Sequence, residues 1–202
     1  PKQGLATGDN DRFLRNWFEL SKSKIEFKGV KKNKWFPCSK GGPFRRWFGN
    51  KLLVVNWDED GFEIKNFKDD DGKLRSRPQN LTYYFREGIT WSTISAGKIS
   101  FRYINNSIFE TKGSVLFPNN ERLEKIFGYV NSKVFQYLIE ITSPTMDYHE
   151  GPVGMIPYCQ FSNKVAEEIV NNCIDFSKID WDSHETSWDF VHSPLINITS
   201  TL

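Results

Sequence analysis

The spacing of apolar residues predicts three helices. An apolar residue at every third or fourth position predicts a helix over Asp11–Leu20, with Asp9 able to cap its N-terminus. The same period runs without interruption through Leu123–Ile141 and predicts one long helix there. A final helix is expected near Asn163–Phe176.

Short strand patterns fill the region between the first two helices. The apolar run Leu52–Trp57, followed by an acidic turn, predicts a hairpin over residues 52–67. Ile89–Ile94 and Ile99–Ile104 predict a second hairpin, and two further short strands are expected within 107–117. The order of these elements predicts an α+β fold, with a mixed, mainly antiparallel sheet of hairpins, flanking helices and a C-terminal helical segment.

Composition narrows the class of protein. The chain has 202 residues, of which 38% are hydrophobic, as in globular proteins. Its longest aliphatic run, Leu52–Val55, is far shorter than the ~20 residues of a membrane helix. The three cysteines form no Cys-x-x-Cys pair, and the first residues carry no signal-peptide pattern. We therefore expect part of a longer cytoplasmic protein, without disulfides or a zinc site.

Charge is distributed unevenly along the chain. Residues 1–102 hold 21 Lys and Arg against 12 Asp and Glu, whereas residues 103–202 hold 6 against 13. A basic half suggests a surface that faces a polyanion. Chance segregation of solvated charge is the alternative that the sequence leaves open.

Catalytic motifs are sparse. The sequence has no Walker loop, no Gly-x-Ser-x-Gly and no His-Glu-x-x-His, and its three histidines are scattered. Glu-x-Lys after an upstream aspartate is a pattern of Mg²⁺-dependent nucleases, and it occurs at Glu26-Phe27-Lys28 and Glu63-Ile64-Lys65. Because this tripeptide is frequent by chance, an embedded nuclease remains only an alternative.

Aromatic and basic residues alternate in the basic half, which is typical of nucleic-acid binding. Lys and Arg neutralise phosphates, and Arg and Asn can bond to base edges. Trp35, Trp47 and Trp57 are better explained as core residues around which the hairpins pack. The candidate residues outside that core role are Arg45, Arg46, Asn50, Lys73, Arg75, Arg77, Trp91, Lys98 and Arg102.

Several strings along the chain carry a resemblance to one enzyme family. The first is the opening Thr7-Gly8-Asp9-Asn10-x-Arg12-Phe13-Leu14. The others are Lys34-Trp35-Phe36, Lys40-Gly41-Gly42, Arg46-Trp47-Phe48-Gly49-Asn50, Val55-Asn56-Trp57, Arg77-Pro78-Gln79-Asn80, Glu87-Gly88-Ile89-Thr90-Trp91-Ser92, Ser100-Phe101-Arg102-Tyr103, Asn131-Ser132-Lys133, Ser143-Pro144-Thr145 and 180–190. Together they resemble the large bacterial adenine-N6 DNA methyltransferases with a TaqI-like specificity region, and within them the PglX-type enzymes of BREX phage defence.

The resemblance implies methyl transfer from S-adenosylmethionine to an adenine flipped out of duplex DNA. The family's catalytic Asn/Asp-Pro-Pro-Tyr/Phe motif and Gly-rich cofactor loop do not occur here, so neither catalytic nor cofactor-binding residues are expected in these residues. The resemblance instead implies a DNA target-recognition domain over 1–160. Residues 161–202 would form a helix and acidic tail that packs on it or on the catalytic domain.

The resemblance also suggests roles and partners. The expected contacts to the DNA backbone are Arg45, Arg46, Lys73, Arg75 and Arg77. The candidates for contacts in or near a groove are Asn50, Trp91, Ser92 and Arg102. Lys98 is a further candidate for DNA binding. The implied partners are double-stranded DNA, the catalytic domain of the same chain and other defence-system subunits. A purely protein-interacting role for the acidic half is the third possibility.

Overall fold

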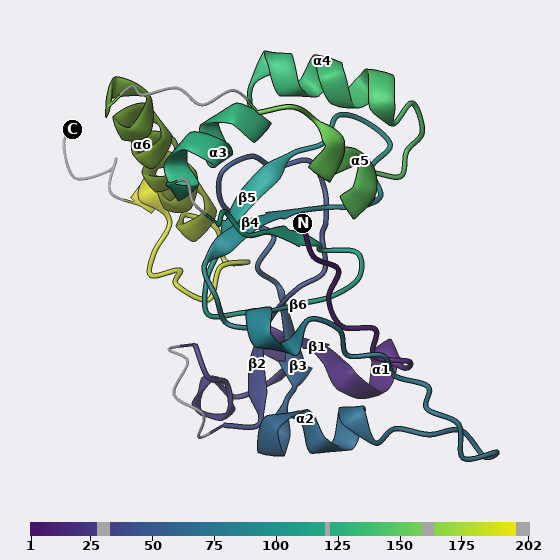
Figure 1. Cartoon of the computed structure of the whole chain (residues 1–202). Coiled ribbons are helices and arrows are strands. Elements are labelled where there is room, and N and C mark those ends of the chain that lie inside the picture. The colour runs from purple at the N-terminus through teal and green to yellow at the C-terminus, as the bar shows by residue number, and fades with distance from the viewer. Residues whose placement is uncertain (28–32, 120–121, 159–163, 197–202) are drawn as a thin grey trace.

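The strands of the computed structural model form two sheets, and the helices cover different ends of the molecule (Figure 1). The structure describes residues 1–27, 33–119, 122–158 and 164–196. Helices α3 to α6 gather beside the sheet that contains β4 and β5, whereas α1 and α2 lie at the opposite end beside β1 and β3. The predicted α+β class is confirmed.

The first sheet has the strand order β1-β3-β2-β6. Its strands are β1 (Leu14–Asn16), β2 (Trp35–Ser39), β3 (Leu53–Asn56) and β6 (Ile108–Phe109). β3 pairs antiparallel with both β1 and β2, and β6 pairs parallel with β2. Val54 and Val55 of β3 are fully buried, because a central strand contacts the protein on both faces.

The second sheet has the order β5-β4-β7 and is antiparallel. Its strands are β4 (Gly88–Trp91), β5 (Phe101–Ile104) and β7 (Val115–Leu116). The predicted hairpin of residues 89–104 is confirmed by the pairing of β4 with β5. Trp91 and Phe101 face each other in the register and are both fully buried in the core that this sheet shares with α3, α4 and α5.

Four helices complete the fold around the second sheet. They are α3 (Leu123–Val130), α4 (Lys133–Thr142), α5 (Glu150–Met155) and α6 (Lys164–Asp182). α6 packs along α3 and carries two buried side chains, Val170 and Trp181. The final helix is longer than the predicted Asn163–Phe176, and the proline-containing loop that precedes it contains α5. No helix in the described ranges has the length and apolar character needed to cross a membrane.

The predicted helix over Asp11–Leu20 is wrong beyond its first turn. Asp9 caps α1 (Asn10–Phe13) as expected, with its carboxylate accepting a hydrogen bond from the Arg12 backbone N–H at 3.0 Å. From Leu14 the chain is extended, because β1 pairs with β3. Pairing with a distant strand overrides the helical spacing of the apolar residues.

The predicted hairpin over residues 52–67 is also wrong. β3 finds its partners in β1 and β2, and the chain after it forms the helical segment α2 (Asp58–Lys65). Three consecutive residues from Glu59 to Gly61 have left-handed backbone angles. A Cβ at Gly61, whose φ is +75°, would lie 2.7 Å from the Trp57 ring, so this turn requires glycine.

The predicted helix over Leu123–Ile141 is divided into α3 and α4. The Ser132 hydroxyl accepts a hydrogen bond from the Phe135 N–H at 3.2 Å and thereby caps α4. The preceding Asn131 side chain bonds to both the N–H and the C=O of Phe101 in β5. The two strands expected within 107–117 exist as β6 and β7 but lie in different sheets.

Candidate functional site

The segment that joins β2 to β3 folds over the edge of β5. The Trp47 N–H donates to the Phe101 carbonyl at 2.8 Å, and the Tyr103 N–H donates to the Trp47 carbonyl at 2.7 Å. Gly49 has a φ of +126°, and a Cβ there would lie 2.4 Å from Arg45 Nε. Only glycine therefore allows the loop to close against the arginine.

A buried arginine, Arg102, holds this loop through hydrogen bonds. Arg102 is 1% exposed, and its guanidinium donates to Ser92 Oγ at 3.2 Å and to the Arg45 carbonyl at 3.4 Å. Ser92 in turn donates to the Gly42 carbonyl at 2.8 Å. Burial lowers the pKa of Arg102 to about 10, which leaves it charged at neutral pH. Ser92 and Arg102 thus hold the loop in place from inside the protein.

Two more of the predicted residues have internal partners. Trp91 is fully buried and its indole N–H donates to the Tyr148 carbonyl at 2.8 Å. The Asn50 side-chain amide donates to the Pro43 carbonyl at 2.9 Å and closes the loop on itself. In this conformation, Trp91 does not reach the surface.

Arg45 connects the loop to the end of α6. Its guanidinium forms an ion pair with Asp180, lies 5.0 Å from the centre of the Trp181 ring, and donates through Nε to the Phe48 carbonyl at 3.0 Å. A charge that is paired and stacked in this way is largely neutralised by the protein itself.

Arg46 and Lys98 are the predicted cations of this end that have no acidic partner among the described residues. The Arg46 guanidinium lies 5.6 Å from the centre of the Phe44 ring, and Phe44 is 56% exposed. Lys98 is exposed in the connection between β4 and β5. An exposed aromatic ring beside a cation is a combination that can contact a nucleic-acid backbone and bases.

The remaining predicted cations belong to the other end of the molecule. Lys73, Arg75 and Arg77 are exposed on the segment that follows α2. Arg75 lies 5.1 Å from the centre of the Phe67 ring, and the Arg77 backbone pairs with Ala6. Figure 1 places α2 and α6 at opposite ends, so the structure brings the predicted residues together in two separate groups.

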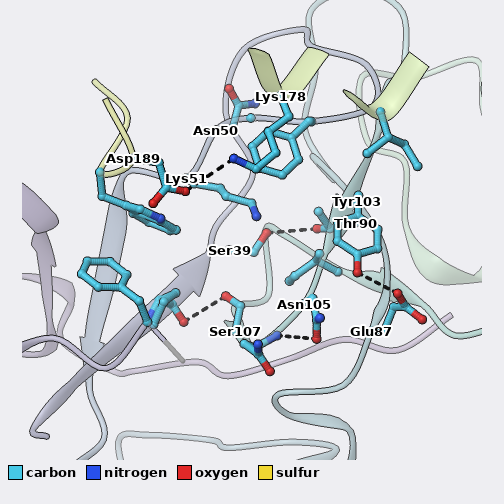
Figure 2. A pocket seen from close by; sticks show the side chains of 18 of the residues that line it. Ser39, Asn50, Lys51, Glu87, Thr90, Tyr103, Asn105, Ser107, Lys178 and Asp189 are labelled. Carbon is cyan, nitrogen blue, oxygen red and sulfur yellow. Dashed lines mark hydrogen bonds and ion pairs between the residues drawn. The ribbon is translucent and has the colours of Figure 1, made fainter. Parts of the chain in front are cut away.

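Beside the first group lies a cavity of about 490 Å³ that the sequence did not predict (Figure 2). Its walls come from the 48–51 loop, β2, β5, the 105–107 turn, α6 and the tail that follows α6. Ser39 and Thr90 hydroxyls are bonded at 3.0 Å, and the Tyr103 hydroxyl donates to Glu87 at 2.7 Å. No motif marks the cavity because its lining residues are separated by up to 162 positions, from Phe27 to Asp189.

Lys51 supplies a charge to the centre of this cavity. Figure 2 shows its ammonium directed inward, near Ser39, whereas the neighbouring Lys178 is turned toward Asp189 at 3.7 Å. Burial, and then the positive charge of Lys178, lower the pKa of Lys51 to about 8. Within the described part of the chain, no carboxylate forms an ion pair with Lys51.

The nuclease pattern is not assembled into a metal site. Glu63 bonds to Arg12 at 2.8 Å and to Asn56 at 2.9 Å, and Lys65 pairs with Asp60 at 2.9 Å. The other candidate pair includes Lys28, which lies outside the described residues. Among the residues that the structure covers, no group of three His, Cys, Asp or Glu side chains could hold a metal ion.

Comparison with known proteins identifies relatives along nearly the whole chain. No family model matches. The chain is 36% identical over 203 residues to the adenine-specific methyltransferase PglX of Lacticaseibacillus casei, and 36% identical over 199 residues to the adenine-specific methyltransferase BrxX of Escherichia coli. Each match covers 96% of this chain but only 17% and 16% of the relative. The chain is therefore homologous, over almost all of its length, to one segment of the PglX- and BrxX-type adenine-specific methyltransferases.

Proposed function

We propose that these residues form the DNA target-recognition domain of a site-specific adenine-N6 DNA methyltransferase of a phage-defence or restriction-modification system. The domain would hold duplex DNA for methylation by a catalytic domain elsewhere in the same cytoplasmic protein. The observation that carries this proposal is the homology to adenine-specific methyltransferases in a segment without catalytic motifs. Base flipping costs a few kcal/mol, and DNA contacts outside the catalytic domain can supply that energy.

S-adenosylmethionine, the methyl donor that such enzymes use, does not fit the described residues. Dinucleotide- and nucleoside-binding α/β folds place a Gly-rich loop between a parallel strand and a helix. The one parallel strand pair described here, β2 with β6, extends over two residue pairs and has no such loop. Cofactor binding therefore belongs, in this proposal, to the catalytic domain.

The proposed phosphate contacts are the exposed Lys98, Lys73, Arg75 and Arg77, together with the half-buried Arg46, which lies beside the exposed Phe44 ring. The residues with internal partners, Arg45, Asn50, Trp91, Ser92 and Arg102, would act indirectly by shaping the loop that carries Arg46.

The test is duplex DNA binding by fluorescence anisotropy at several salt concentrations. Each phosphate contact adds about 0.9 to the slope of log K against log salt, so replacing Lys73, Arg75 and Arg77 together with glutamate should reduce that slope by up to about 3. The double variant Arg46→Glu/Lys98→Glu measures the other group separately. Lys133→Glu, a charge reversal on α4, is the matched control.

Binding that is insensitive to salt would refute the proposal. If the loss per reversed charge is the same in the control as in both test variants, the proposal is also refuted, because the effect then follows net charge and no particular surface. In the full-length enzyme, the same substitutions should reduce adenine methylation in proportion to the loss of DNA affinity.

Apolar side chains on α6 favour a second role, in contact with the catalytic domain of the same chain. Val165, Ile169, Phe176 and Ile179 recur at spacings of four, seven and three and are 55–72% exposed. This spacing presents a continuous apolar stripe to a partner helix or surface. Phe176→Ser should lower the melting temperature of the full-length enzyme more than that of the isolated 202 residues; equal shifts would count against this role.

A further inference from the structure

We propose that the cavity beside α6 binds a nucleotide, with its phosphate at the Lys51 ammonium and its base against the polar wall at 105–107. The nucleotide can come from two sources: a free mononucleotide, or a nucleotide of a bound DNA strand. The second source rests on the proposed DNA-binding function, and the first does not.

The size and walls of the cavity suit a mononucleotide. Its volume of about 490 Å³ lies within the range of about 300–1,000 Å³ that is typical of small-molecule sites. Phe48, Tyr103 and Ile174 provide flat or apolar surface for a ring, and the turn that precedes β6 provides the side-chain amides of Asn105 and Asn106. Side-chain amides in such a wall can bond to the edge of a base.

Lys51 is the group that selects a phosphate. Its ammonium points into the cavity and lies 4.1 Å from the centre of the Phe48 ring, the face of which attracts the cation only weakly. Within the described residues, the carboxylates of Asp182 and Asp189 form their ion pairs with Lys178 and favour the charged form of Lys51 only from a greater distance. A buried ammonium without an ion pair gains from an anionic ligand.

The acidic residues limit the charge that the ligand can carry. Glu87, Glu124 and Asp175 also line the cavity, and Glu87 accepts a hydrogen bond from the Tyr103 hydroxyl. A second or third phosphate extended from Lys51 would approach these carboxylates and be repelled. The cavity should therefore prefer a monophosphate to a triphosphate.

The experiment is an NMR titration of the protein labelled with ¹³C at the lysine ε-carbons, with AMP, ATP, inorganic phosphate and a single-stranded oligonucleotide as separate probes. AMP should raise the pKa of Lys51 and shift its ε-carbon resonance, while leaving the resonance of the exposed Lys133 on α4 unchanged. AMP should bind at least tenfold more tightly than inorganic phosphate or ATP. Lys51→Met should weaken AMP binding at least tenfold, and Lys133→Met should have no effect.

Each outcome decides the proposal. A response to AMP supports the free nucleotide, and a response to the oligonucleotide alone supports a nucleotide of a DNA strand. No response of Lys51 to either probe at millimolar concentration overturns the proposal, and so does equal affinity for AMP and inorganic phosphate. The titration of the unaltered protein gives this answer even if Lys51→Met does not fold. If the unaltered protein binds AMP but does not bind duplex DNA, only the proposed DNA-recognition function is refuted.

Discussion

Replacement of Trp91 by phenylalanine tests whether this residue acts through the core or through DNA. The Trp91 side chain is fully buried, packs against the Phe101 ring at 5.7 Å between centres, and donates its indole N–H to the Tyr148 carbonyl at 2.8 Å. Phenylalanine keeps an aromatic ring but removes the donor and part of the volume. We expect Trp91→Phe to destabilise the fold without a direct effect on DNA affinity.

The size of the effect follows from these two losses. A buried carbonyl left without its donor costs about 1–3 kcal/mol. Full truncation of a buried tryptophan to alanine costs about 3–5 kcal/mol, and the partial truncation to phenylalanine should cost about 1–2 kcal/mol. The free energy of unfolding should therefore fall by about 2–5 kcal/mol. For a chain of this length, each kcal/mol lowers Tm by about 2–4 °C, so Tm should decrease by about 4–20 °C.

Chemical denaturation and thermal melting measure the loss of stability, and anisotropy with duplex DNA well below Tm measures affinity. Trp17→Phe is a matched control, because the Trp17 indole also donates to a backbone carbonyl, that of Thr186 at 3.0 Å, but at an exposed site. We expect the control to cost less than about 1 kcal/mol. Unchanged Tm together with weaker DNA binding in Trp91→Phe would refute the core role.

Three further predictions concern local interactions. Ser132→Ala removes the cap of α4 and should lower the free energy of unfolding by about 1 kcal/mol, measured by urea denaturation; no change would show that α4 does not need the cap. The hydrogen bond from Arg12 keeps the pKa of Glu63 below its usual value, so its stabilisation is present above the unfolded-state pKa near 4.3 and is lost as pH falls through the lower folded pKa. Glu63→Gln should remove this part of the acid dependence, and identical pH profiles for the two proteins would exclude the effect. Gly49→Ala should cost about 1–3 kcal/mol because of its φ of +126°, and an unchanged melting temperature would contradict the strained loop geometry.

Local patterns in the sequence determined the elements that depend on nearby residues. Asp9 caps a helix because its carboxylate needs only the backbone three residues ahead, and residues 89–104 form a hairpin because both strands lie on either side of one turn. The α+β class follows from the order of such elements. The family resemblance was also contained in the sequence, because strings such as Arg46–Asn50 can be compared without coordinates.

Long-range contacts decided the rest. The helical spacing of residues 11–20 gave way to β1 because Leu14 pairs with Val55, which lies more than forty positions away. Leu123–Ile141 is divided where Asn131 bonds to the Phe101 backbone. Val55 and Phe101 are both far from these segments in the sequence. Apolar periodicity within a local window therefore predicted uninterrupted helices over 11–20 and 123–141.

The tertiary structure also decided which charges face solvent. In the sequence, Arg102 and Arg46 are both simply positive charges of the basic half. In the structure, Arg102 is buried beneath the 40–50 loop and bonds to Ser92, whereas Arg46 lies against the exposed Phe44 ring. The Lys51 cavity likewise exists only because β2, β5 and α6 meet around it. Composition determined that the first half is basic, and only the packing of distant segments determined where each cation lies, because burial and pairing depend on neighbours in space.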